Sequence, residues 1–260
     1  MKGDVLCFSP QGQLIFKLPN VGINSNTVLF RNKASQGNPD ENPADPEAGA
    51  FANKVLEYNP APSQYMNTSY TAYEEGFTGI QVLARATELL QDRTTCLFTL
   101  GGFGGNITVG FDHTIPNVPG EYDFKIYGNA YYDMYGTLLD NPGGNSEPGI
   151  VLVSKDTNGN GLPDDEWYEL AGSEYNSPAT IRNYEITYYR PTPADGDVKW
   201  KDNQGKEGYI YRNTYHTQGS YYPAWMPAEI TFRGSRLADN SINEPRPGMP
   251  EHWVGYCYAW

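Results

Sequence analysis

The sequence predicts an all-β protein with one packing helix, arranged as a β-sandwich or jelly roll. Three observations lead to this prediction. First, the 260 residues include 21 Tyr, 10 Phe and 5 Trp beside 28 Gly and 20 Pro, a composition typical of strands joined by tight turns. Second, apolar and polar residues alternate over many short segments, as in half-buried strands. Third, about seven such segments are separated by turn residues, as in sandwiches.

The first 50 residues are predicted to be separate from the main domain. Short β-prone runs at residues 5–8 and 14–18 flank a turn-rich segment, which predicts an N-terminal hairpin. Residues 32–49 hold three prolines and four acidic residues, which is typical of a linker. We therefore predict a hairpin and a Pro- and acid-rich linker at residues 1–50, followed by a β-sandwich domain at residues 51–260.

One segment, Thr78 to Gln91, has the periodicity of a helix. Thr78 as N-cap and Gln81 three residues later form a capping box. The apolar face expected to pack on the core comprises Ile80, Leu83, Ala84, Thr87 and Leu90.

Beyond this helix the apolar period changes from 3.6 to 2, which indicates consecutive strands. The dipeptide Pro119-Gly120 suits a type II turn between the first two of them. Strands are predicted at residues 107–111, 122–126, 150–153, 184–189, 208–211, 229–232 and 253–260.

The charge balance argues against two classes of partner. Acidic residues outnumber basic ones by 31 to 18, a formal net charge of −13, and no segment concentrates Lys and Arg. Nucleic acid and anionic membrane surfaces are therefore poor partners. No apolar run approaches the roughly 20 residues of a membrane-spanning helix, and the first residues lack the segments of a secretory signal.

Cysteine, histidine and glycine patterns predict structural roles. Cys7, Cys96 and Cys257 lie in apolar or aromatic runs, which favours buried, inert thiols over a disulfide framework. The three histidines lack the spacing of zinc ligands. The glycine-rich segment 101–105 precedes a strand, so a turn or a close backbone approach is favoured over a phosphate-binding loop.

The loop at residues 156–166, DTNGNGLPDDE, has the layout of a calcium site. Oxygen-bearing side chains stand at positions 1, 3 and 5, and Gly161 at position 6 permits the sharp turn. Position 12 is Trp167 instead of a bidentate Glu, so Asp165 or Glu166 must supply the closing carboxylate. A plain hairpin turn is the alternative, because Asn-Gly pairs also form tight turns. The expected ligands of a structural Ca²⁺ are Asp156, Asn158, Asn160, the carbonyl of Leu162, Asp164, Asp165 and Glu166.

Residues 167–225 are dense in Tyr and Trp, more than strand alternation alone would bury. Exposed aromatic rings with a polar tip suit stacking on sugar rings or a planar cofactor. The aromatic residues in turn-rich stretches are the better ligand-binding candidates, although for any single one packing in the core or at its rim is favoured over ligand contact: Trp200, Tyr221, Tyr222 and Trp225.

Three blocks of the sequence resemble secreted or lipid-anchored cell-surface proteins of gut Bacteroidetes, some of them associated with PKD modules. The blocks are LGGFGGNITVGFDHTIPNVPGEYDFKIYGNAYYD (residues 100–133), SEPGIVLVSKDTNGNGLPDDEWYELAGSEY (146–175) and NYEITYYRP (183–191). The resemblance extends from about Val55 to the C-terminus. It implies a jelly-roll-like domain, a calcium loop and a cell-surface or secreted location beside an outer-membrane nutrient-uptake system. It also draws attention to Asp123, Asn129 and Glu147 at polar positions of these blocks.

Together these observations predict a calcium-binding cell-surface protein that captures a glycan or a vitamin-type nutrient without transforming it. Two alternatives stay open. A carbohydrate-active hydrolase would use a carboxylate pair, which is defined by distance in space and not by sequence spacing. A structural or adhesive surface module would bind proteins or whole cells instead of small ligands.

Overall fold

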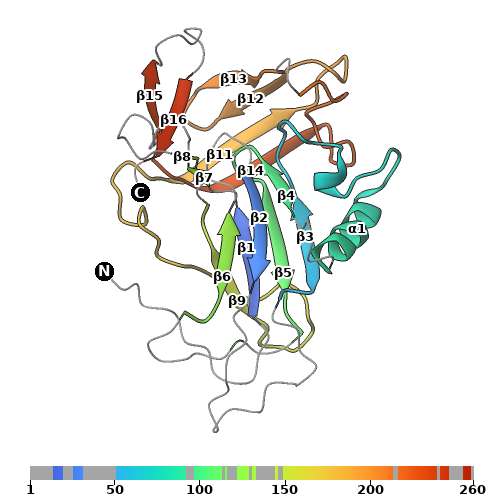
Figure 1. The fold of residues 1–260 in the computed structure, drawn as a ribbon, viewed down its shortest axis with the longest axis vertical. Helices are drawn as coiled ribbons and strands as arrows, with labels where there is room; N and C mark the ends of the chain where they lie inside the picture. Colours follow the sequence, from blue (N-terminus) through green and yellow to red (C-terminus); the bar gives the residue numbers. More distant parts are fainter. Residues whose placement is uncertain are drawn as a thin grey trace.

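Antiparallel strands make up most of the computed structural model of this chain (Figure 1). The structure describes residues 14–19, 26–31, 51–91, 97–112, 115, 122–128, 131–132, 144–145, 149–212, 216–238, 241–245 and 254–258. A single α-helix and a short 3-10 turn, η1 (Ser69–Thr71), accompany the strands within these ranges. The predicted all-β class is therefore confirmed, whereas the sandwich arrangement stays a prediction.

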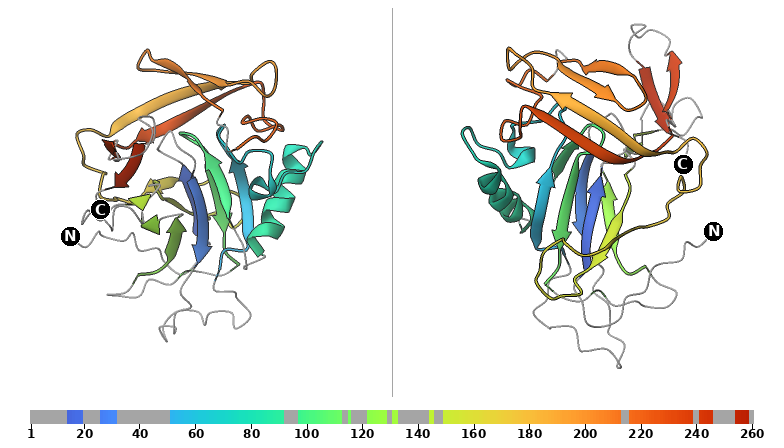
Figure 2. Two further views of the ribbon diagram at one scale, coloured as in Figure 1. Left: turned by 45° about the horizontal axis from the view of Figure 1, so that its top comes forward. Right: turned by 180° about the vertical axis from the view of Figure 1, so that it is seen from behind.

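The two largest sheets contain five and four strands. The five-stranded sheet has the order β10 (Trp167–Glu169), β9 (Leu152–Lys155), β1 (Leu14–Pro19), β5 (Asn106–Gly110) and β3 (Lys54–Asn59). The four-stranded sheet has the order β13 (Glu207–Ile210), β12 (Val198–Asp202), β11 (Ile181–Tyr189) and β14 (Glu229–Arg236). Figure 2 shows that β11 and β14 run across the strands of the five-stranded sheet.

The remaining strands form smaller sheets. A three-stranded sheet has the order β4 (Phe98–Gly101), β2 (Asn26–Arg31) and β6 (Lys125–Gly128). Two further pairs join β7 (Tyr131–Tyr132) to β8 (Gly144–Asn145), and β15 (Ser241–Pro245) to β16 (Val254–Tyr258).

Most of the predicted strands are confirmed with shifted ends. Strands β5, β11, β13, β14 and β16 overlap the predicted segments, while β6 begins three residues later than predicted and β9 two residues later. In β11 the alternation that predicted the strand is realised, because Tyr184, Ile186 and Tyr188 are buried on one face. The turn at Pro119-Gly120 and the β-prone run at residues 5–8 lie outside the described residues.

Strands from the first 50 residues pair with strands from later in the chain. β1 is hydrogen-bonded between β5 and β9, and β2 lies between β4 and β6. Residues 32–50 lie outside the described residues, so the boundary at residue 50 stays a prediction.

The predicted helix is confirmed as α1 (Gly79–Gln91). Its capping box is formed, since the Thr78 N–H donates to Gln81 Oε1 (2.9 Å) and the Gln81 N–H donates to Thr78 Oγ1 (3.4 Å). These two bonds satisfy backbone donors that the first turn of a helix leaves open.

The face of α1 that packs on the core was predicted wrongly in part. The buried residues are Val82, Ala86 and Leu90, spaced four apart, whereas Ile80 is 83% exposed and Ala84 is exposed. The helix carries apolar residues on two adjoining stripes, and its packing against β3 selects one of them.

Two apolar clusters form the core of the described residues. One includes residues of β3, β4, β5, β9 and α1, and the other lies against the four-stranded sheet. The Tyr58 hydroxyl donates to the Thr99 carbonyl oxygen (2.7 Å), which ties β3 to β4 across two sheets. Burial raises the pKa of Tyr58 well above its ordinary value.

The glycine-rich turn between β4 and β5 joins these two clusters. Phe103 at its tip is 1% exposed, contacts Tyr184 edge-on with ring centroids 4.8 Å apart, and accepts a hydrogen bond from the Tyr188 hydroxyl (3.1 Å). Gly104 has φ +86°, and a Cβ at this position would lie 2.1 Å from Cβ of Phe232. The predicted close backbone approach is thus confirmed, and it sets the distance between the turn and β14.

No helix among the described residues is long and apolar enough to cross a membrane.

Candidate functional site

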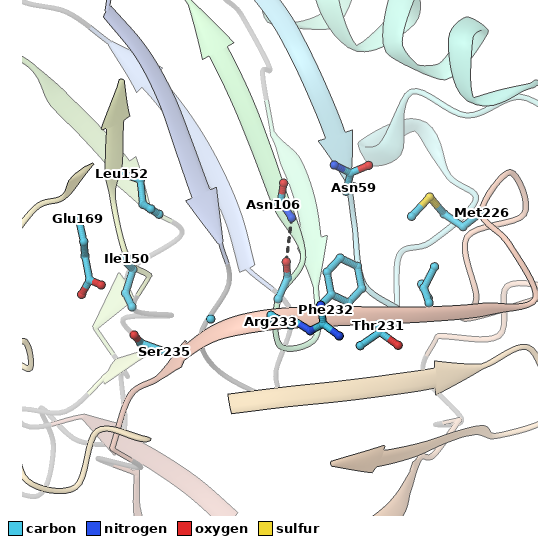
Figure 3. A pocket seen from close by; sticks show the side chains of 13 residues that line it. Asn59, Asn106, Ile150, Leu152, Glu169, Met226, Thr231, Phe232, Arg233 and Ser235 are labelled. Carbon is cyan, nitrogen blue, oxygen red and sulfur yellow. Dashed lines mark hydrogen bonds between the residues drawn. The ribbon is translucent and has the colours of Figure 1, made fainter. Parts of the chain in front are cut away.

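A cleft of about 520 Å³ lies between β14 and the five-stranded sheet (Figure 3). Its volume falls within the range of about 300–1,000 Å³ found for small-molecule sites. The strands of the five-stranded sheet cross β14 here and do not run alongside it. The lining residues are Asn59, Gly104, Asn106, Ile150, Leu152, Glu169, Met226, Ile230, Thr231, Phe232, Arg233, Gly234 and Ser235.

Two asparagines stand at the ends of neighbouring strands in the cleft wall. Asn59 closes β3 and Asn106 opens β5, and the two are direct cross-strand partners. Asn106 is 6% exposed, and its Nδ2 donates to the Gly104 carbonyl oxygen (2.9 Å). Its Oδ1 is buried and has no hydrogen-bond partner among the described residues. A buried acceptor without a partner is destabilising.

The opposite wall is the open edge of β14. β14 is the last strand of its sheet and pairs with β11 alone among the described strands. The Arg190 N–H donates to the Ala228 carbonyl oxygen (2.7 Å), which fixes the phase of the antiparallel ladder. Hydrogen-bonded residue pairs alternate with non-bonded ones along an antiparallel ladder. The backbone N–H and C=O groups of Ile230 and Phe232 therefore bond to β11. The N–H and C=O groups of Thr231 and Arg233 consequently point away from β11, at the edge that lines the cleft.

One end of the cleft is held by an ion pair. Arg182 Nη1 donates to both carboxylate oxygens of Glu169 (3.0 and 2.9 Å) and to Oγ of Ser235 (2.9 Å). Its guanidinium also lies over the Tyr175 ring, 4.7 Å from the centroid. These contacts join β10 to the far end of β14 and fix Glu169 in place.

Apolar side chains complete the lining. Ile150 and Leu152 extend from the five-stranded side and Phe232 from β14. Ile230 of β14 also lines the cleft. Phe232 and Ile230 are 8% exposed and belong to the second core cluster. The cleft therefore combines a few placed polar groups with an apolar surface, the usual composition of a ligand site.

The predicted calcium loop connects β9 to β10, and Asp156 organises it. This residue is 4% exposed, and its carboxylate accepts hydrogen bonds from three backbone N–H groups: Gly159 (2.7 Å), Asn160 (3.2 Å) and Gly161 (2.8 Å). The loop therefore wraps around one buried carboxylate, that of the residue expected at the first ligand position.

The other expected ligands bond to one another within the loop. Asn160 Nδ2 donates to Asp164 Oδ2 (3.0 Å), and Asn158 Oδ1 accepts from the Asn160 N–H (2.9 Å). Asp165 bonds to the hydroxyl of Thr157.

The last two expected ligands, Leu162 and Glu166, make contacts of other kinds. Leu162 donates its N–H to Asn160 Oδ1 (2.8 Å). Glu166 accepts from the Tyr168 hydroxyl (2.6 Å), which raises the pKa of that tyrosine. Among the residues that the structure describes, no three His, Cys, Asp or Glu side chains are gathered as a metal-binding group.

Tyr221 and Tyr222 are core residues, so of the two roles considered for them the structure shows core packing and not an exposed ring. They are 1% and 0% exposed, and their hydroxyls donate to the carbonyl oxygens of His216 (2.8 Å) and Pro227 (2.6 Å). Burial raises the pKa of Tyr222 to about 12. Both rings belong to the second apolar cluster. Their burial is possible because each hydroxyl has a hydrogen-bond partner.

The two tryptophan candidates are partly buried. Trp200 packs against the second cluster. Trp225 packs against the first cluster and stacks on Tyr73 with centroids 5.3 Å apart. Neither lines the cleft.

Of the three polar positions that the resemblance singled out, one is described by the structure, and it does not line the cleft. Asp123 is half-buried just before β6, and Asn129 and Glu147 lie outside the described residues. The cleft residues Asn59, Asn106, Glu169 and Thr231 were not predicted, because they come from four strands that the sequence separates by up to 172 residues. The one available signal was an asparagine at each of two strand ends.

Comparison with known proteins found no match among protein-family models and none among curated protein sequences.

Proposed function

We propose that this chain is a ligand-binding protein whose binding site is the cleft between β14 and the five-stranded sheet. The observation that carries this proposal is a cleft of about 520 Å³ between two crossing sheets, lined by apolar side chains together with Asn59, Asn106 and Glu169. Placed polar groups over an apolar floor are suited to holding a glycan or a vitamin-type nutrient.

Calcium belongs to this proposal as a structural ion of the loop at residues 156–166. Asp156 would supply a carboxylate oxygen, and Asn158, Asn160 and the carbonyl of Leu162 would supply neutral oxygens, a donor set that suits Ca²⁺. Asp164, Asp165 and Glu166 would complete the shell by exchanging their present contacts for the ion.

The loop and the cleft are joined by one hairpin. Leu152 in β9 and Glu169 in β10 are cross-strand partners, both line the cleft, and the loop connects the two strands at their other ends. An ion that fixes the loop would therefore hold this side of the cleft in register, which lowers the cost of binding.

The surroundings of the protein follow from the family resemblance and remain part of the proposal. We propose a secreted or lipid-anchored protein of the bacterial cell surface that delivers its ligand to an outer-membrane uptake system.

The ligand-binding function is tested by thermal unfolding of the full chain in millimolar calcium with host glycans, plant glycans, cobalamin and haem. A ligand that binds only the folded protein raises Tm in a saturable way. The variant Asn106→Leu should lose this rise, whereas Gln91→Ala on the exposed end of α1 should keep it. A panel without any rise would refute the proposal, and release of reducing sugar would replace it with a hydrolase.

Calcium binding is tested separately by isothermal titration calorimetry of protein stripped with EDTA. We expect one site and a Tm that rises on adding Ca²⁺. Asp156→Asn should abolish the heat, whereas Glu174→Gln, outside the loop, should leave it unchanged. Equal heats for the two variants would remove calcium from the proposal.

A further inference from the structure

The loop between β9 and β10 carries a chemically labile dipeptide twice. Asn158-Gly159 and Asn160-Gly161 are the two Asn-Gly pairs of the chain. In such a pair the glycine nitrogen can attack Cγ of the preceding asparagine, because glycine has no side chain to hinder the approach. The new N–Cγ bond closes a cyclic succinimide, the Cγ–Nδ2 bond breaks, and the glycine N–H proton leaves with the ammonia. Water then opens the ring to aspartate or isoaspartate, and the exposure of both asparagines gives water access.

The structure holds both attacking nitrogens in hydrogen bonds to one carboxylate. The Gly159 N–H donates to Asp156 Oδ1 (2.7 Å), and the Gly161 N–H donates to Asp156 Oδ2 (2.8 Å). A peptide nitrogen attacks only once it gives up its proton, and a charge-assisted bond from the N–H holds that proton in place. A carboxylate is far too weak a base to remove the proton itself. The geometry of Asp156 therefore opposes ring closure at both pairs.

The two asparagine side chains are held to different degrees. Asn160 is fixed at both ends of its amide, since Oδ1 accepts from the Leu162 N–H (2.8 Å) and Nδ2 donates to Asp164 Oδ2 (3.0 Å). Asn158 Oδ1 accepts from the Asn160 N–H (2.9 Å), but its Nδ2 lies 3.5 Å from Asp164 Oδ1, beyond the usual length of a hydrogen bond. The leaving amide of Asn158 is thus the less restrained of the two.

We infer that this loop is a site of spontaneous covalent modification, in which Asn158 deamidates before Asn160 and Asp156 slows both reactions by holding the attacking N–H groups. The inference goes beyond the proposed ligand-binding function and does not depend on it. The reaction needs water alone as co-reactant and releases ammonia.

The modification changes the charge of the loop at a defined contact. Asn160 Nδ2 now donates to Asp164 Oδ2 at 3.0 Å. After deamidation a carboxylate oxygen replaces this donor, so two like charges face each other and the loop is weakened unless a cation lies between them. The variant Asn160→Asp should therefore have a lower Tm than the wild type in EDTA, and Ca²⁺ should restore it. An unchanged Tm in EDTA would overturn this consequence.

Deamidation is followed by peptide mass spectrometry of the full chain incubated in EDTA at mildly alkaline pH. Fragmentation assigns the mass change to Asn158 or Asn160, and the chain unfolded in urea gives the rates without the loop contacts. We expect both residues to react at least about tenfold more slowly in the folded chain, the factor that corresponds to a hydrogen bond to a charged group. Within the folded chain, Asn158 should react first.

One variant and one control separate the role of Asp156 from general unfolding. Asp156→Ala removes the acceptor of both N–H groups and should raise both rates about tenfold. Gly104→Ala also destabilises the chain, through a clash with Phe232, but it leaves the loop contacts in place and should keep the wild-type rates. Circular dichroism checks that both variants are folded at the temperature of incubation.

The outcomes decide each part of the inference. Equal rates in the folded and the unfolded wild-type chain would overturn the protection, and this comparison does not depend on any variant folding. An Asp156→Ala rate at or below that of the wild type would overturn the role of the carboxylate. Equal acceleration in Gly104→Ala would assign the reaction to global unfolding and overturn that role as well. Reaction at Asn160 before Asn158 would overturn the order.

Discussion

Replacing Gly104 with alanine perturbs the contact that sets the width of the cleft. Gly104 has φ +86°, and a Cβ would meet Cβ of Phe232 at 2.1 Å. Gly205, in the turn between β12 and β13, is the matched control, because it has φ +79° and nothing within 4 Å of the added Cβ. Both substitutions therefore place an alanine at positive φ, but only Gly104→Ala also creates a steric clash.

The magnitudes follow from these two terms. An L-residue in the left-handed region costs roughly 1–2 kcal/mol, and overpacking a tight site adds about 1–3 kcal/mol. We expect Gly205→Ala to lower the free energy of unfolding by about 1.5 kcal/mol and Gly104→Ala by about 4 kcal/mol. At about 3 °C per kcal/mol for a chain of this size, Tm falls by roughly 4 °C and 12 °C respectively.

Thermal unfolding followed by circular dichroism measures both variants under identical conditions. Gly104→Ala should also weaken ligand binding at temperatures where it is folded, because Gly104 lines the cleft. If the two variants melt within about 2 °C of each other, which is less than 1 kcal/mol, the turn does not press on β14 and the geometry argued for the cleft is wrong.

Three further predictions concern the loop and the buried tyrosines. Asp156→Ala removes the acceptor of three backbone hydrogen bonds, and because the freed N–H groups reach solvent we expect a loss of about 3 kcal/mol; an unchanged urea midpoint in EDTA would contradict this. Tyr58→Phe keeps the ring but removes the bond to Thr99 and should cost about 1–2 kcal/mol in urea unfolding; a cost near zero would show that the hydroxyl is dispensable. The pKa values of Tyr184 and Tyr222 are raised from 10.0 to about 12, chiefly by burial. The two hydroxyls stay protonated to higher pH in the folded state than in the unfolded state. The free energy of unfolding therefore keeps their full contribution below about pH 10 and falls between about pH 10 and 12, by up to about 1.4 kcal/mol per pH unit for each group. Equal free energies of unfolding near pH 9 and near pH 11 would refute this prediction.

Local patterns sufficed for the elements whose signal is contained in a few neighbouring residues. The capping box at Thr78 fixed the start of α1, and alternation in residues 184–189 predicted the core of β11. The glycines of residues 101–105 indicated a close backbone approach. The layout of residues 156–166 predicted a sharply turning loop, and the contacts of Asp156 with backbone N–H groups of this loop all lie within six residues.

The same patterns misplaced residues whose environment depends on distant partners. Ile80 was expected to pack on the core, but the packing of α1 on β3 turns it to solvent. Tyr221 and Tyr222 were candidates for an exposed ligand-binding face, but their rings fill the second cluster with Phe103 and Tyr184 from distant parts of the chain. Propensity describes which conformations a segment favours and not which of its faces a neighbour covers.

The sequence by itself determined the all-β class, the helix, half of the described strands and a turn-rich loop at residues 156–166, because each depends on local periodicity or turn chemistry. The tertiary structure alone decided the cleft. Asn59, Asn106, Glu169 and Thr231 come from strands of two different sheets, and only the crossing of β14 over the five-stranded sheet brings them together. That crossing depends on long-range packing of Phe103 and Gly104 against β11 and β14, which leaves no periodic trace in the sequence.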